Sequence, residues 1–114
     1  MSAITTHVLD VSIGRPAAGV LVRLDRRKHD GQWEPLGSQK TDSDGRARDL
    51  LTADKPLIAA VHRLRFDVSA YFSANQVEGF YPEVTIAFMV NDASQHYHVP
   101  LLLSPFGYST YRGS

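Results

Sequence analysis

The sequence contains no cysteine, which excludes disulfide bonds, thiolate nucleophiles and zinc sites built on cysteine. It also lacks an excess of charge, because 12 Lys and Arg residues balance 12 Asp and Glu residues. No overall field therefore favours nucleic acid or an anionic membrane as a partner. No apolar run approaches the roughly 20 residues of a membrane span, and the first residues resemble no secretion signal. We expect an unprocessed cytoplasmic protein whose partner is a small molecule or another protein.

What the sequence does contain is a succession of short segments rich in β-branched and aromatic residues, separated by Gly, Pro, Asp and Ser. This pattern is typical of an all-β sandwich or barrel. A chain of 114 residues fits one domain, so we predict a single domain over residues 1–114. The strands are predicted at residues 4–12, 19–28, 32–41, 57–68, 83–91, 96–103 and 108–112.

Two turns and a helix punctuate these strands. Asp30 and Gly31 predict a type I′ turn, in which both residues have positive φ. Residues 42–45 have the spacing of acidic residues that opens a calcium loop, but Ala53 occupies the position where the loop needs a bidentate Glu. We therefore interpret them as an Asx-type turn. A short helix is expected over residues 69–76, with Ser69 as its N-cap.

Five histidines raise the question of a metal site. His96 and His98 share one face of a predicted strand, and two such imidazoles can bind a metal. No third histidine or acidic residue lies near them in the sequence, so the ligand set of a zinc site is incomplete and we expect no metal.

The last four residues, 111–114, are unusually rich in functional groups for a chain end. They supply a phenol, a guanidinium and a hydroxyl, and they closely follow the most apolar run of the chain, at 99–103. Arg46 directly follows the turn at 42–45, where a guanidinium is well placed to hold a planar or anionic group, although most arginines are simply solvated. Histidines can act as general acids or bases. The residues alone do not tell whether these groups meet.

The chain resembles the transthyretin-related family along nearly its whole length. The matching motifs are His7-Val8-Leu9-Asp10, Gly14-Arg15-Pro16-Ala17, Trp33-Glu34-Pro35, Lys40-Thr41, Leu102-Leu103-Ser104-Pro105 and Tyr108-Ser109-Thr110. One branch of the family is an extracellular thyroid-hormone carrier, and the other is the 5-hydroxyisourate hydrolase of urate degradation. The enzyme branch has a histidine in the first strand, an arginine after the Asp-Gly turn, a histidine before the Val-Pro step and a C-terminal Tyr-Arg-Gly-Ser. Here these are His7, Arg46, His98 and residues 111–114, whereas His96 is outside the pattern and is expected at the rim.

The resemblance implies a sandwich of two four-stranded antiparallel sheets with one short helix. It further implies a homotetramer, a dimer of dimers, whose sites lie in a central channel where chains meet and bury the tail. The implied reaction opens the six-membered ring of 5-hydroxyisourate at a cyclic amide and gives 2-oxo-4-hydroxy-4-carboxy-5-ureidoimidazoline. It requires no cofactor and no metal.

The resemblance also assigns roles to residues. His7 and His98 would position and deprotonate water, and either could be the general base. Arg46 would bind the carbonyl oxygens and stabilise their developing charge, and Ser114 would orient water or a histidine. Tyr111 and Arg112 would bind the planar substrate together with His7 and Arg46. The alternatives are a small-ligand or thyroid-hormone carrier without enzymatic activity, because a fold alone does not fix function, and a structural domain in which residues 111–114 are dispensable.

Overall fold

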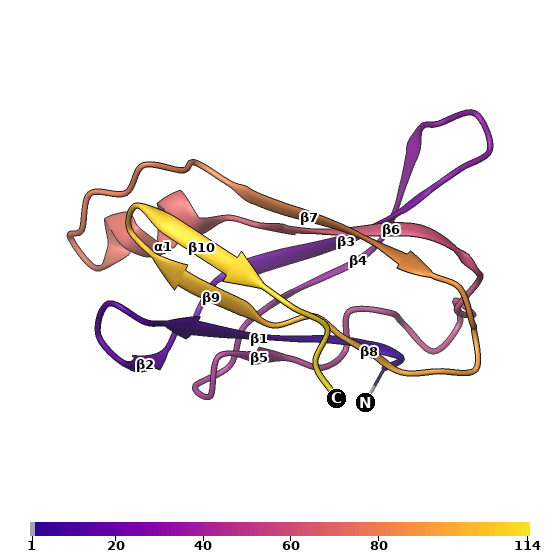
Figure 1. Ribbon diagram of the computed structural model, residues 1–114, viewed down its shortest axis with the longest axis horizontal. Helices are drawn as coiled ribbons and strands as arrows, with labels where there is room; N and C mark the ends of the chain where they lie inside the picture. The colour runs from indigo at the N-terminus through magenta and orange to yellow at the C-terminus, as the bar shows by residue number, and fades with distance from the viewer. Residues whose placement is uncertain (1) are drawn as a thin grey trace.

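Two β-sheets packed face to face make up the structure, a computed structural model that describes residues 2–114 (Figure 1). The helix lies at one end of the sandwich (Figure 1). This confirms the predicted sandwich of two sheets with one short helix. Within the described residues, no helix is long and apolar enough to cross a membrane.

The first sheet has six strands and is organised around β1 (Ile4–Asp10). β1 pairs antiparallel with β2 (Arg15–Pro16) and β5 (Arg46–Ala47), and parallel with β8 (Tyr97–His98) and β9 (Leu101–Ser104). β10 (Gly107–Thr110) closes one edge against β9. The expected four antiparallel strands were therefore wrong for this sheet. The two-residue strands β2, β5 and β8 raise the number of strands in this sheet. The long connection from β1 to β8 and β9 allows these strands to pair in parallel.

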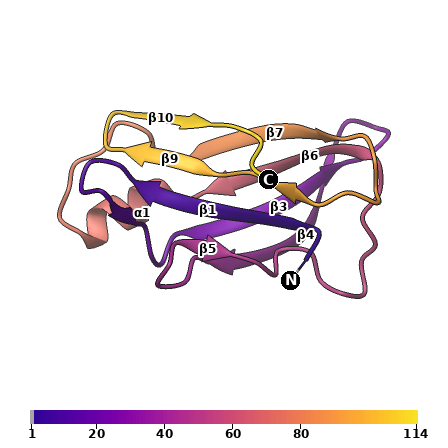
Figure 2. The same ribbon diagram turned by 60° about the horizontal axis from the view of Figure 1, so that its bottom comes forward.

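The second sheet has the four antiparallel strands that were expected, in the order β4-β3-β6-β7 (Figure 2). Their bounds are β3 (Leu21–Arg27), β4 (Trp33–Lys40), β6 (Ala60–Phe66) and β7 (Val84–Val90). The hairpin between β3 and β4 is present, but its turn is not type I′. Gly31 alone has positive φ, at 84°, and its N–H donates to the carbonyl of Lys28, which is a type I turn followed by one left-handed residue.

The helix α1 (Val68–Ala74) begins one residue earlier than predicted. Its N-cap is Asp67, whose carboxylate accepts a hydrogen bond from the backbone N–H of Ala70 at 3.2 Å. Ser69 lies inside the helix, so its prediction as the cap was wrong. β6 ends at Phe66, which leaves Asp67 as the first residue free to take the cap position.

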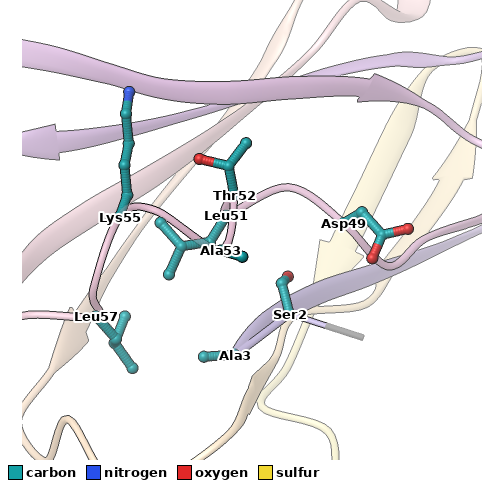
Figure 3. A pocket seen from close by; sticks show the side chains of 8 residues that line it. All are labelled: Ser2, Ala3, Asp49, Leu51, Thr52, Ala53, Lys55 and Leu57. Atoms are coloured by element: carbon teal, nitrogen blue, oxygen red, sulfur yellow. The ribbon is translucent and has the colours of Figure 1, made fainter.

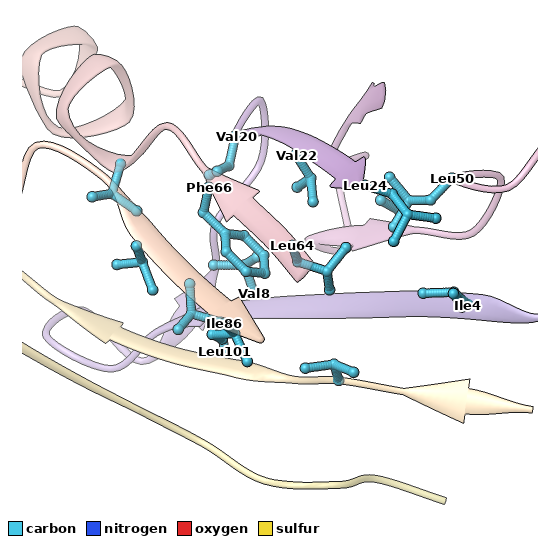
Figure 4. Packing of buried hydrophobic residues seen from close by; sticks show 14 of the residues in the cluster. Ile4, Val8, Val20, Val22, Leu24, Leu50, Leu64, Phe66, Ile86 and Leu101 are labelled. Atoms are coloured by element: carbon cyan, nitrogen blue, oxygen red, sulfur yellow. The ribbon is translucent and has the colours of Figure 1, made fainter. Parts of the chain in front are cut away.

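The core fills the space between the sheets and fixes which side chains face outward (Figure 4). Alternate residues of each strand point inward, as the predicted alternation required; examples are Val22, Leu24, Leu64, Phe66 and Val84, all fully buried. In β1 the inward set includes Ile4 and Val8, also fully buried. Thr5 and His7 consequently point to the outer face of the six-stranded sheet.

Candidate active site

A cavity of about 270 Å³ joins four segments that are distant in the sequence. It is lined by Thr5, Thr6, Arg46, Arg48, His96, His98 and Ser114. The structure thus brings together three residues expected at the site, Arg46, His98 and Ser114.

Sheet register explains why these side chains meet. His7 pairs with Arg46 across β1 and β5, and Thr5 pairs with His98 across β1 and β8. Directly paired residues project from the same face of a sheet. Because Thr5 and His7 are two apart in β1, all four side chains lie on the outer face of the six-stranded sheet.

The chain end reaches the site through a contact that only glycine permits. Gly113 donates its N–H to the carbonyl of His98 at 2.8 Å. A Cβ at position 113 would lie 2.6 Å from Cδ2 of His98, closer than carbon atoms can approach. Gly113 therefore lets Ser114 come to the cavity beside the imidazole of His98.

Arg46 is held by the turn before it. The Oδ1 atom of Asp42 accepts hydrogen bonds from the N–H groups of Asp44, at 2.9 Å, and Arg46, at 3.0 Å, which confirms the predicted Asx-type turn. Gly45 has φ of 76°, and a Cβ there would lie 2.4 Å from the carbonyl oxygen of Val8. Among residues 2–114, no side chain pairs with the guanidinium of Arg46, whereas the Arg48 guanidinium is 2.8 Å from Asp42.

The imidazole of His98 is half-buried and suited to act as a base. Burial lowers its pKa from the ordinary value of 6.5, and the charges of Arg46, His96 and His7 lower that pKa further, against a backbone hydrogen bond to Thr5 that raises it. His98 is therefore neutral at pH 7. A neutral imidazole beside an unpaired guanidinium can accept a proton from water while the guanidinium stabilises an oxyanion.

The remaining residues expected at the site lie around or away from this cavity. His7 is beside Arg46 on the same face and acts on the pKa of His98, but it does not line the cavity. The Arg112 guanidinium lies 4.6 Å from the ring centroid of Tyr97 and donates to Gln95 at 3.0 Å. Tyr111 is exposed, and with Arg112 it lines a separate groove of about 320 Å³ along β7. Within one chain, these two tail residues do not meet His98.

Sequence reasoning missed Thr5, Thr6 and Arg48 as lining residues and placed His96 only at the rim. Two of them carried a signal, because Thr5 is two residues before His7 and Arg48 is two residues after Arg46. A period of two puts each on the same face as its neighbour. Thr6 belongs to the opposite face of β1, and its hydroxyl donates to the carbonyl of Val99 at 2.6 Å.

A larger cavity, of about 470 Å³, lies between the start of the chain and the loop that precedes β6 (Figure 3). Its titratable side chains are Asp49 and Lys55, and its other lining residues are Ser2, Ala3, Leu51, Thr52, Ala53 and Leu57. It holds no imidazole. No three His, Asp or Glu side chains of residues 2–114 converge as metal ligands there or elsewhere.

Comparison with known proteins places this arrangement in context. Residues 4–113 match the profile of the HIUase/Transthyretin family. The 5-hydroxyisourate hydrolase of Caulobacter vibrioides is 48% identical over 119 residues, covering 100% of both chains. The solved structure of the Klebsiella pneumoniae 5-hydroxyisourate hydrolase is 36% identical with a TM-score of 0.83, covering 97% of this chain and 98% of that one.

A protein of a different kind has a backbone at least as similar to this chain as that of the Klebsiella enzyme. Sea bream transthyretin, solved in complex with thyroxine, is 30% identical with a TM-score of 0.89, covering 98% of this chain and 95% of that one. Its TM-score exceeds that of the Klebsiella enzyme. The backbone therefore does not separate hydrolysis from hormone binding, and the side chains of the site must do so.

Proposed function

Because the chain belongs to the HIUase/Transthyretin family, we propose that it hydrolyses 5-hydroxyisourate to 2-oxo-4-hydroxy-4-carboxy-5-ureidoimidazoline in purine catabolism. The observation that carries this proposal is the convergence of Arg46, His98 and Ser114 in one cavity. Its curated relatives support the same activity, since the hydrolases of Caulobacter vibrioides and mouse are 48% and 43% identical to the chain.

The chemistry of the cavity favours an enzyme over a carrier. Small-molecule sites depend on a few precisely placed polar groups to fix orientation and specificity. In this cavity the lining includes two imidazoles and two guanidinium groups among seven residues, and Arg46 has no side-chain partner within residues 2–114. Unpaired charge beside a neutral base suits a reaction in which charge develops.

The proposed mechanism uses His98 as the general base. His98 takes a proton from water as the water oxygen bonds to the carbonyl carbon of the cyclic amide. Arg46 stabilises the negative charge that forms on the carbonyl oxygen. The C–N bond then breaks, the ring nitrogen takes a proton, and the carbonyl carbon becomes a carboxyl group. Every bonding step is therefore supplied by water and side chains, and the proposal includes neither a cofactor nor a metal.

The other expected residues keep supporting roles in the proposal. Ser114 orients the water or the imidazole of His98 from the cavity wall. His7 helps to position the substrate next to Arg46. Tyr111 and Arg112 lie outside the cavity of their own chain, so their proposed contact with the planar substrate requires the tail to be repositioned or a second chain to be present.

We propose a homotetramer, a dimer of dimers, as the working form in the cytoplasm. β7 and β10 are the edge strands of their sheets, and unpaired edges are ready to pair with another chain. Met89 on β7 is 64% exposed and Tyr111, just after β10, is 58% exposed, which is costly for apolar side chains in water. The cavity opens on the outer face of the six-stranded sheet, where a second pair of chains would form a channel.

The first test measures the ultraviolet absorbance of freshly prepared 5-hydroxyisourate with and without the protein, because this compound also decays spontaneously. We expect accelerated decay that falls about 10²-fold or more in Arg46→Ala and in His98→Asn. Arg23→Ala is the matched control, since Arg23 is exposed on the opposite sheet and should leave the rate unchanged.

Two results would contradict the proposal. Decay no faster than the blank, from a folded tetramer, would favour the carrier, and thyroxine binding to the same protein would then be measured by calorimetry. Equal rate losses in Arg46→Ala and Arg23→Ala would remove Arg46 from the reaction.

A further inference from the structure

A single hydroxyl group lies between two imidazole rings at the wall of the cavity. Oγ1 of Thr5 is 2.8 Å from Nδ1 of His98 and 3.1 Å from Nε2 of His96. The two rings are nearly parallel, with their planes 16° apart and their centroids 6.5 Å apart. Thr5 is only 4% exposed, so water does not compete freely for its hydroxyl.

The hydrogen-bonding capacity of these groups couples the two rings. A hydroxyl has one proton to donate, whereas each neutral imidazole has one N–H and one bare nitrogen. The two facing nitrogens therefore cannot both be bare. If both carried protons, the buried hydroxyl of Thr5 would need a third partner, and the described residues offer none. All groups are satisfied when one facing nitrogen donates to Thr5 and the other accepts from it.

The direction of this hydrogen-bond chain follows from the proposed role of His98. Nδ1 of His98 faces Thr5, so Nε2 is the ring nitrogen left to act as the general base, and a base must be bare. Nδ1 of His98 therefore carries the proton, and Nε2 of His98 is the bare atom available to the cavity. Thr5 in turn donates to Nε2 of His96, a residue that is exposed to solvent.

We propose that Thr5 and His96 form a proton relay that connects His98 to solvent during hydrolysis, an inference that rests on the proposed function. In this assignment Thr5 is a positioning residue that fixes which nitrogen of His98 is bare. His96, which lies outside the family pattern of the sequence, is the end of the relay.

Over one turnover, the relay takes back from solvent the proton that it released. As water attacks, its proton goes to Nε2 of His98. The Nδ1 proton of His98 then goes to Oγ1 of Thr5, and the original hydroxyl proton of Thr5 goes to Nε2 of His96. His96 then loses its Nδ1 proton to solvent. When the C–N bond breaks, His96 takes a proton from solvent, the transfers run in reverse, and Nε2 of His98 delivers a proton to the leaving nitrogen. Both rings return to their first tautomers.

The charges around His98 explain why a relay would help the reaction. Arg46 on β5, His7 on β1 and His96 all act against a positive charge on His98, and the ring is half-buried. A protonated His98 would stand as a cation beside the Arg46 guanidinium, which is unfavourable. Passing a proton onward through Thr5 places the charge on exposed His96 instead, where water solvates it.

The first experiment reads the tautomers without using activity. Ring ¹⁵N chemical shifts distinguish protonated from bare nitrogens, and we expect Nδ1 of His98 to carry the proton in the native protein. Thr5→Val keeps the shape of the side chain but removes the hydroxyl, so a large share of His98 should move to the tautomer protonated at Nε2. Thr5→Ser keeps the hydroxyl and should keep the native pattern. The same tautomer in Thr5→Val as in the native protein would overturn the coupling.

The second experiment reads the relay in turnover. We expect kcat to fall by about 10-fold to 10²-fold in Thr5→Val and His96→Gln with little change in KM, and to stay within about threefold of native in Thr5→Ser. Gln at 96 can still hydrogen-bond to Thr5 but cannot carry a proton. The rate plotted against the deuterium fraction of the solvent should curve for the native protein, because several protons move, and should be closer to linear for Thr5→Val.

The outcomes separate the relay from the reaction itself. Native kcat and an unchanged isotope curve in His96→Gln would overturn the relay while leaving the hydrolase intact. A native protein that does not accelerate 5-hydroxyisourate decay would overturn the proposed function and the relay in turnover, and the ¹⁵N comparison would still decide the coupling of the two tautomers.

Discussion

His62 places a titratable ring inside the hydrophobic core. It is fully buried on β6, and its Nδ1 lies 3.0 Å from the carbonyl oxygen of Ala60, so Nδ1 carries the proton and donates it. Nε2 is bare and has no partner among the described residues. Burial lowers the pKa of His62 below 6.5, and the charge of Arg26 lowers it further. Protonation would leave a cation in the core, 6.0 Å from the ring of Phe88.

This residue predicts how stability depends on pH. The folded state holds the His62 proton more weakly than the unfolded state, so the contribution is fully present above pH 6.5. It is lost progressively as the pH falls below 6.5 toward the lowered pKa. We expect His62→Phe to flatten the fall of the urea midpoint over this range, with part of the slope remaining because the pKa of His98 is lowered too. His29→Gln, at the exposed hairpin turn, should keep the native slope; equal slopes in all three proteins would contradict the prediction.

At the residue scale, the sequence named candidate residues but not how they would be arranged. Residue chemistry and the family resemblance named Arg46, His98 and Ser114, and one cavity contains all three, while their catalytic roles remain predictions. Thr5 was missed because nothing in the sequence indicates that a threonine of the first strand will face a histidine 93 residues later. Its alternation with His7 predicts a face, but only the pairing of β1 with β8 predicts a contact.

At the scale of elements, the Asx turn connects local structure to the site. Asp42 orders the backbone up to Arg46, and its second oxygen holds Arg48 at 2.8 Å. Asp42→Ala removes these acceptors, and we expect kcat to fall by up to about 10²-fold, because a displacement of 1 Å at a site can cost that much. Asp42→Asn keeps the Oδ1 acceptor and should keep most of the activity. Circular dichroism spectra of both variants should match the native spectrum. Equal activity in the two variants would contradict the prediction that the turn positions Arg46 for catalysis.

Most strands could be predicted from the sequence, and the strands and the helix cap that could not be predicted have local causes. Alternation located β3, β6 and β7 because one face of each is buried, a pattern that survives in the sequence. The two-residue strands β2, β5 and β8 are too short to show any period. Ser69 and Asp67 are both good capping residues, and the end of β6, not side-chain chemistry, decides between them.

At the scale of the whole molecule, sequence patterns predicted two layers but not the direction of every strand. A period of two says that a segment is a strand and which face is buried, but it does not say which strand lies beside it. The parallel pairing of β1 with β9 therefore could not be foreseen from residues alone. The family resemblance supplied the sandwich, and the number of strands in each sheet came only from the structure.

The assembly is testable at the same scale. We expect sedimentation equilibrium to give four times the 12.6 kDa of one chain. Deleting residues 111–114 should abolish most turnover, because Ser114 leaves the cavity, while the circular dichroism spectrum stays native, because the described hydrogen bonds of the deleted segment to the rest of the chain are few. A truncated chain with native turnover would favour the structural-domain interpretation, and a monomer with full activity would contradict the proposed channel.

The position of β1 has a consequence for how the protein is made. β1 leaves the ribosome long before its sheet neighbours β8 and β9, which come much later in the sequence. Contacts so far apart along the chain slow folding, because a long loop must close before they can form. A nascent chain therefore carries β1 with one side unpaired until β8 and β9 have been synthesised. Incomplete chains that stall before β8 would expose that strand edge and be natural substrates for chaperones.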